Sequence, residues 1–182
     1  MTQALNFQKQ LTGRMAFWLA ATIIVSMLAL IACGDSNSSE TVASQADENK
    51  LVVGRFIEEF KNKANHDIVD ELLTDDFVHH LKDPRLPPGR PAIKLLGQSI
   101  AGGFPVVKAT VEELLAVGDK VIERTSVAAT HTGEFNGIPA TGNKVNWTEI
   151  HIYRLIDGNI VELWSEIDLL ALLTQLGALP GA

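Results

Sequence analysis

Residues 144–167 read KVNWTEIHIYRLIDGNIVELWSEI. Side chains that favour strands alternate with polar ones on both sides of DGN, residues 157–159, which is a typical turn sequence. The pattern predicts two antiparallel strands, 144–156 and 160–167, joined in a tight hairpin. With a two-residue loop, odd-numbered positions of the first strand pair with even-numbered positions of the second.

The two faces of this predicted hairpin differ in chemistry. One face carries aromatic, imidazole and carboxylate side chains: Trp147, Glu149, His151, Tyr153, Glu162, Trp164, Glu166 and Asp168. The other is aliphatic: Ile150, Ile152, Ile156, Val161, Leu163 and Ile167. This contrast indicates that one face packs, while the other lines a cavity or meets solvent.

The same reasoning extends outward along the chain. Strands are predicted at 107–117 and 120–132, joined by Gly118-Asp119, with a looser connection over 133–143. Helical periodicity predicts helices at 51–60, with Asp47 as N-cap, and at 68–73, 92–100 and 169–176, with a loop at 83–91. Helices first and a long antiparallel meander after favour an α+β fold, with the helices packed on one face of a strongly curved sheet.

The N-terminus has the layout of an export signal. Lys9 and Arg14 precede an uncharged apolar run, Met15 to Ala32, which ends before the only cysteine, Cys33. The run is at the lower limit of length for crossing a bilayer, so an uncleaved anchor is the alternative. Residues 34–47, GDSNSSETVASQAD, lack apolar periodicity and are predicted to form a flexible tether before a domain over 48–182.

Charge and cysteine content exclude several classes of function. The chain has 15 Lys+Arg against 22 Asp+Glu, and loss of residues 1–32 removes two bases, which leaves a net charge of about −9. A nucleic-acid partner is therefore not expected, because phosphate binding needs concentrated positive charge. A single cysteine also allows no intrachain disulfide.

Four parts of the sequence resemble known families. Residues 30–33, LIAC, resemble a bacterial lipobox, which implies cleavage before Cys33 and its acylation. The other three parts resemble the SnoaL-like polyketide cyclases. They are residues 48–80, HTGEF at 131–135 with GIPATG at 137–142, and DGNIVELW at 157–164. That resemblance implies the cone of the nuclear transport factor 2-like fold. It also implies ring closure in a polyketide ester by aldol condensation, without a cofactor.

Asp168 is the first candidate for a catalytic group, because it lies where the family places an acidic residue. A carboxyl group can shuttle the proton that aldol closure requires, and Trp164 would raise its pKa by supplying apolar surface. Alternatively, Asp168 is only the N-cap of the helix at 169–176.

Histidines and aromatic residues complete the predicted site. His80 and His131 are candidates for polarising a developing oxyanion. The candidates for binding substrate are Trp147, His151, Tyr153, Trp164 and Glu166. No metal is expected, because no histidine pair has the i, i+4 spacing of helix-borne ligands.

The predicted function is that of an exported SnoaL-like protein, anchored in the cell envelope through acylated Cys33. Its anchor would lie on the outer side of the cytoplasmic membrane or in the outer membrane. Its cone would hold a small apolar carbonyl or ester compound, as a cyclase, isomerase or dehydratase or as a non-catalytic binding domain; a structural domain with a filled cone is the third possibility. The aliphatic face of the last hairpin, with Ile150, Ile152 and Leu163, predicts a homodimer.

Overall fold

The structure, a computed structural model, describes residues 36–81 and 83–179. A compact unit begins at Ser44 and contains the sheet. The elements are α2 (Ser36–Ile57), η1 (Glu58–Asn62), α3 (Ile68–Leu72), β1 (Leu73–His79), α4 (Arg90–Gly103), β2 (Val107–Val117), β3 (Lys120–Thr130), β4 (Lys144–Ile156), β5 (Asn159–Ile167) and α5 (Leu169–Gln175).

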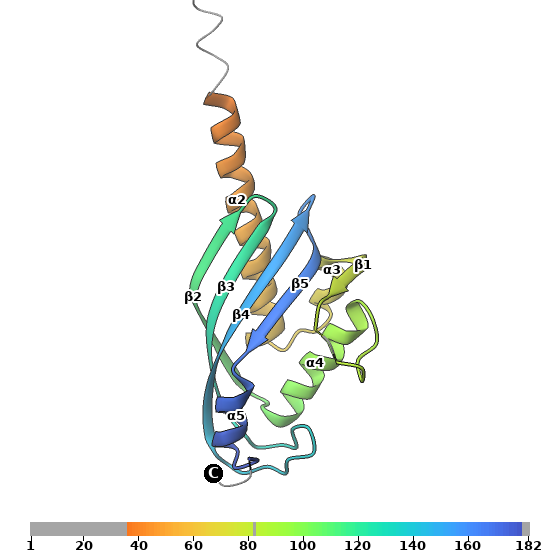
Figure 1. Ribbon diagram of the computed structural model, residues 1–182, viewed down its shortest axis with the longest axis vertical. Coiled ribbons are helices and arrows are strands. Elements are labelled where there is room, and N and C mark those ends of the chain that lie inside the picture. The colour runs from red at the N-terminus through yellow and green to blue at the C-terminus, as the bar shows by residue number, and fades with distance from the viewer. Residues whose placement is uncertain (1–35, 82, 180–182) are drawn as a thin grey trace, which may run out of the picture. The chain divides into compact units, whose positions relative to one another are not determined.

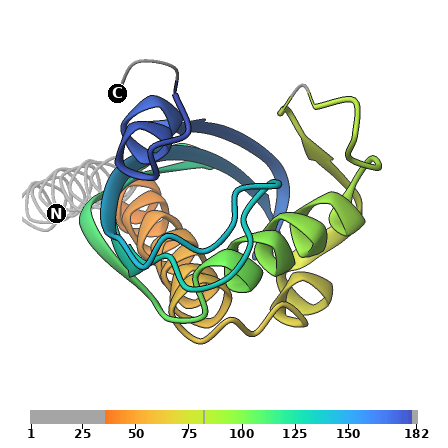
Figure 2. The same cartoon turned by 90° about the horizontal axis from the view of Figure 1, so that it is seen from below.

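Five strands form one sheet in the order β1-β5-β4-β3-β2 (Figure 1). The strands β2 to β5 form an antiparallel meander, and β1 pairs with β5 in parallel. Figure 2 shows the sheet curving around α2, with α4 across the open side. The predicted α+β class with a strongly curved sheet is confirmed.

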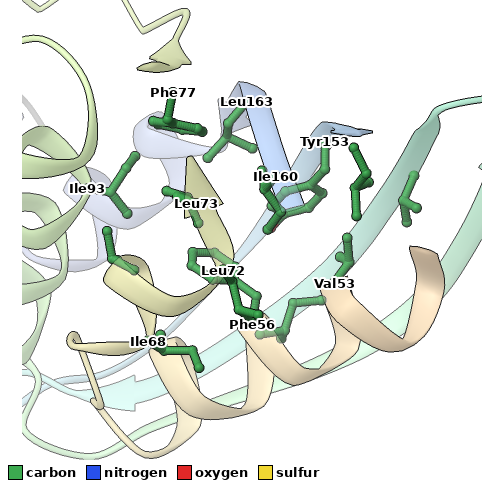
Figure 3. Packing of buried hydrophobic residues seen from close by; sticks show 14 residues of the cluster. Val53, Phe56, Ile68, Leu72, Leu73, Phe77, Ile93, Tyr153, Ile160 and Leu163 are labelled. Atoms are coloured by element: carbon green, nitrogen blue, oxygen red, sulfur yellow. The ribbon is translucent and has the colours of Figure 1, made fainter. Parts of the chain in front are cut away.

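The helices pack on the concave face through two clusters of buried apolar side chains. Val53 and Phe56 of α2 are buried against Tyr153 and Ile160 of the sheet (Figure 3). Each such buried side chain contributes roughly 1.5–3 kcal/mol. A second buried cluster, which includes Phe104, Trp147 and Leu172, lies where β4 meets α5. The two clusters fix where the inward-facing polar side chains lie.

Two predictions about local structure are corrected. Residues 36–47 of the predicted tether belong to α2, so Asp47 is inside the helix and pairs with Lys50 rather than capping. Helix growth adds one hydrogen bond for each residue fixed, and Glu40, Ala43, Gln45 and Ala46 are tolerated or favoured in helices. Residues 1–35, with the predicted signal and Cys33, lie outside the described residues.

Strand β1 was not predicted. Asp75 and Asp76 disfavour strands, and only the tertiary structure supplies β5 as a partner. The pairing aligns Val78 with Glu162 and His79 with Leu163. His79 is thereby placed on the edge strand beside β5.

Candidate functional site

A short π-helical turn positions the first polar group of the site. Asn62 at the end of η1 binds the backbone of Ala109 in β2 twice: its Oδ1 accepts from the Ala109 N–H at 2.7 Å, and its Nδ2 donates to the carbonyl at 3.2 Å. This clamp holds η1 against the sheet. The neighbouring Lys61 extends under β3 and β4, where its side chain is 13% exposed. Single π-helical turns often occur at functional sites.

Lys61 joins two buried carboxylates on adjacent strands. Its Nζ lies 2.8 Å from Glu123 Oε1 and 2.7 Å from Glu149 Oε2. The β3–β4 register places Glu123 opposite His151 and Thr125 opposite Glu149, so all four side chains share the concave face. Tyr153 donates to Glu123 at 2.6 Å, and the Trp147 indole donates to Glu149 at 2.7 Å. The carboxylates are therefore fully engaged by donors.

The hydrogen bonds continue from Glu149 to a serine. His151 Nε2 lies 3.0 Å from Glu149 Oε2, and His151 Nδ1 lies 2.9 Å from Ser165 Oγ. One continuous series of hydrogen bonds across β4 and β5 thus links Glu149, His151 and Ser165. We name the side chains of Lys61, Glu123, Glu149, His151 and Ser165 the polar cluster.

The charges of the polar cluster are set by mutual attraction. Burial alone would raise the pKa of Glu149, but the charge of Lys61 and the hydrogen bond from His151 outweigh it and lower the pKa well below its usual range. Burial likewise opposes the charge on Lys61, yet Glu149 and Glu123 raise its pKa. One ammonium group and two carboxylates meet here, so these three groups together carry one net negative charge.

A cavity of about 270 Å³ lies between the helices and the concave face of the sheet. Most of its lining is apolar, from α2, η1, α4 and the strands, and includes Phe56, Phe60, Ile93, Leu96 and Phe104. Its polar groups include Lys61, His79, Glu149, His151 and Ser165. An apolar pocket with a few convergent polar groups is typical of small-molecule sites.

His79 adds a neutral imidazole to this cavity. Burial, and then the charges of His151 and His80, lower its pKa to about 4. It has no hydrogen-bond partner among the side chains that the structure describes. An uncharged ring at neutral pH has one N–H donor and one acceptor nitrogen to offer a ligand.

A β-bulge changes which side chains of β5 face inward, so the predicted faces of this strand are wrong. Asp157 and Gly158 both have positive φ, 49° and 77°, as a type I′ turn requires, and Ile156 pairs with Asn159. The register then shifts, because Leu155 pairs with Ile160 but Arg154 pairs with Glu162, which leaves Val161 as the extra residue. One extra residue turns every later side chain to the opposite face.

As a result, inward and outward residues of β5 are exchanged relative to the prediction. Leu163, Ser165 and Ile167 line the cavity, whereas Trp164 and Glu166, the predicted substrate-binding residues of β5, lie on the convex face. The β4 face was predicted correctly. Trp147 and His151 line the cavity, and Tyr153 is buried behind it, hydrogen-bonded to Glu123.

The structure does not bring the predicted catalytic residues together. Asp168 is exposed at the N-terminus of α5, where its Oδ1 accepts from the Ala171 N–H at 3.0 Å, and it does not line the cavity. His80 stacks on Trp164 with ring centroids 4.3 Å apart and contacts Glu162 at 2.8 Å. The observed geometry of Asp168 is that of a helix cap.

His131 is completely buried in the second apolar cluster, outside the cavity lining. Its Nδ1 accepts from the Thr141 N–H at 3.2 Å, and its Nε2 has no partner among the described residues. Its visible role is to hold the 133–143 connection to the end of β3. Its environment is thus separate from that of His80 and Asp168.

The prediction of site residues missed five members of the observed site: Lys61, His79, Glu123, Glu149 and Ser165. Lys61 follows Ile57 by four positions and so shares the core-facing side of the helix, a signal that the sequence contained. His79 and Ser165 depend on pairing that no local pattern specifies. No group of three or more His, Cys, Asp or Glu suited to a metal ion occurs within residues 36–81 and 83–179.

Comparison with known proteins identifies the family of the chain. The sequence profile of the SnoaL-like polyketide cyclases matches residues 51–176, which is most of the chain. The chain belongs to the SnoaL-like polyketide cyclase family. No curated protein matches it significantly in sequence.

Three solved structures share the fold of the domain. AclR from Streptomyces galilaeus, described as a candidate hydroxylase, is 30% identical with a TM-score of 0.67, over 74% of this chain and 99% of AclR. IdmH from Streptomyces antibioticus, described as a candidate polyketide cyclase, is 33% identical with a TM-score of 0.62, over 71% and 98%. A candidate polyketide cyclase from Bacillus cereus is 28% identical with a TM-score of 0.64, over 72% and 82%.

Proposed function

We propose that the cavity binds a small apolar carbonyl or ester compound and that His151 acts as a general base on it, without a cofactor. The observation that carries this proposal is the pair Glu149–His151, hydrogen-bonded at 3.0 Å in a wall of an otherwise mostly apolar cavity. A positioned imidazole is the commonest general base in enzymes. Asp168, the earlier candidate, caps α5 outside this cavity.

The geometry supplies the steps that an aldol closure or isomerisation requires. His151 would remove a proton from a carbon beside the carbonyl group, and ionised Glu149 would stabilise the imidazolium that forms. The neutral ring of His79 would donate its N–H to the oxygen on which charge develops. The apolar walls would exclude water, which strengthens these electrostatic interactions.

Exchange of carbon-bound hydrogen tests this proposal. With 2-tetralone as the probe in D₂O, mass spectrometry is expected to show deuterium uptake beside the carbonyl, and His151→Gln should slow it about a hundredfold. His80→Gln, on the convex face, is the matched control and should exchange at the wild-type rate. Probe binding with no exchange in the wild type would instead support the non-catalytic binding domain.

Membrane anchoring through Cys33 belongs to the same proposal. Its support is the basic start, the apolar run and the LIAC sequence at residues 30–33. No helix within residues 36–81 and 83–179 is long and apolar enough to cross a membrane. Cys33→Ser is expected to abolish acylation and processing, so that cells accumulate the uncleaved form. An unmodified Cys33 in mature wild-type protein, checked by mass spectrometry, would contradict the proposal.

A homodimer through the convex face is proposed as well, with corrected contact residues. Leu163, a predicted contact, is buried inside the domain. The convex face instead carries one row of large apolar side chains across four strands: Leu115, Ile122, Ile152 and Trp164. A row of this kind can be self-complementary about a two-fold axis.

Sedimentation velocity should show a dimer in the wild type. Ile152→Glu should convert this dimer to a monomer, whereas Ile156→Glu, outside the row, should not. A monomeric wild type at high micromolar concentration would refute it.

A further inference from the structure

We propose that Ser165 is a nucleophile that takes the acyl group of an ester bound in the cavity. This inference rests on the proposed function for the cavity but adds covalent catalysis to it. The carrying observation is the continuous chain from Glu149 to His151 at 3.0 Å and from His151 to Ser165 at 2.9 Å. A nucleophile, a base and a group that orients the base are the three parts of a serine triad.

The directions of these hydrogen bonds follow from the charges. Glu149 is ionised beside Lys61 and can only accept, so a neutral His151 must carry its proton on Nε2. Nδ1 then holds the free lone pair, and Ser165 must donate its O–H to it. Ser165 thereby has a base in position to take its proton, as nucleophilic attack requires. The two ring nitrogens have the reverse order of the Ser-His-Asp arrangement, in which the serine contacts Nε2.

The sheet holds all three groups rigidly. His151 and Ser165 are directly opposite each other in the β4–β5 ladder, and Glu149 precedes His151 by two residues on the same face. Ser165 faces inward only because of the bulge at Val161. Bulges that re-aim a side chain are enriched beside active sites.

His79 is placed to stabilise the intermediate. It pairs with Leu163, which precedes Ser165 by two residues on the same face of β5, and it lines the same cavity. A neutral imidazole N–H can donate to the oxyanion of a tetrahedral intermediate. Its freedom from partners among the described side chains leaves that donor available.

The reaction balances with water as the only co-reactant. Ser165 Oγ forms a bond to the ester carbonyl carbon while its proton passes to His151 Nδ1. The intermediate collapses, the bond to the alkoxy group breaks, and the leaving alcohol takes the proton from His151. Water then attacks the acyl-serine, gives its proton to His151, and releases the acid as Ser165 regains its proton.

Acyl transfer from p-nitrophenyl butyrate to the full-length protein in detergent micelles tests the inference. A burst of p-nitrophenol stoichiometric with protein is expected, and peptide mass spectrometry should locate the butyryl group on Ser165. Ser165→Ala and His151→Gln should lower the burst rate at least a thousandfold. Ser126→Ala, a serine on the opposite face of β3, is the matched control and should retain the burst.

Deuterium exchange into 2-tetralone separates this inference from the proposed function, because a ketone has no leaving group to acylate serine. Ser165→Ala should still unfold cooperatively in urea, which reports that the variant is folded and that its lost burst is not a loss of structure. Wild-type protein that exchanges the ketone but acquires no butyryl group at Ser165 would overturn the nucleophile and leave the proposed base intact. Protein that binds neither probe would overturn both.

Discussion

Lys61→Met is expected to destabilise the domain by about 3–5 kcal/mol at pH 7, because it removes the cation from a buried ion triad. Glu123 is fully buried and Glu149 nearly so, and each accepts a hydrogen bond from Lys61. Without that charge, two buried carboxylates remain within one polar cluster. At least one must then take up a proton or remain uncompensated. Chemical unfolding monitored by tryptophan fluorescence measures the change.

Lys63→Met is the matched control for this prediction. Lys63 also pairs with a carboxylate, Glu59 at 2.9 Å, but its side chain is 54% exposed. Exposed pairs contribute about 0–1 kcal/mol, so this variant should lose little stability. Equal losses in the two variants would show that Lys61 contributes through its helix or its alkyl chain rather than through buried charge. Addition of Glu149→Gln to Lys61→Met should recover part of the loss.

Acidification is expected to destabilise the wild type more than His79→Phe between pH 6.5 and pH 4. The pKa of His79 falls from its ordinary value of 6.5 to about 4 in the folded protein, so in this window the unfolded chain binds a proton that the folded chain does not. Stability therefore rises with pH through the window and is lost as pH falls. The shift corresponds to about 2–3 kcal/mol, after allowance for the partial exposure of His79.

Urea unfolding at pH 7, 6, 5 and 4 measures this dependence in both proteins. His66 also has a lowered pKa, caused by burial, and gives both proteins a shared acid sensitivity. Only the difference between the curves belongs to His79. Val78→Ala, its exposed neighbour on β1, should follow the wild-type curve. Parallel curves for wild type and His79→Phe would contradict the proposed neutral state of His79.

Local sequence determined the order of most elements. Alternation at 107–117, 120–130 and 144–156 and the turn residues Gly118 and Gly158 specify a meander, because strand pattern and turn conformation depend on near neighbours. Three- and four-residue spacing located the helices to within a few residues, apart from the start of α2. On β4, alternation grouped Trp147, His151 and Tyr153 on one face, and the structure shows that this face is the concave one.

The tertiary structure decided the candidate site, for reasons that local pattern does not contain. The bulge at Val161 has no recognisable signal in the sequence. It exchanges the two faces of β5 beyond it, so that Ser165 faces the cavity and Trp164 does not. His79 enters the site only because β1 finds a parallel partner far along the chain. Lys61 reaches Glu123 and Glu149 across long separations, where a buried charge is stable only if oppositely charged groups converge on it. Asp168 had two possible roles in sequence, and its exposed position at the start of α5 makes it the cap.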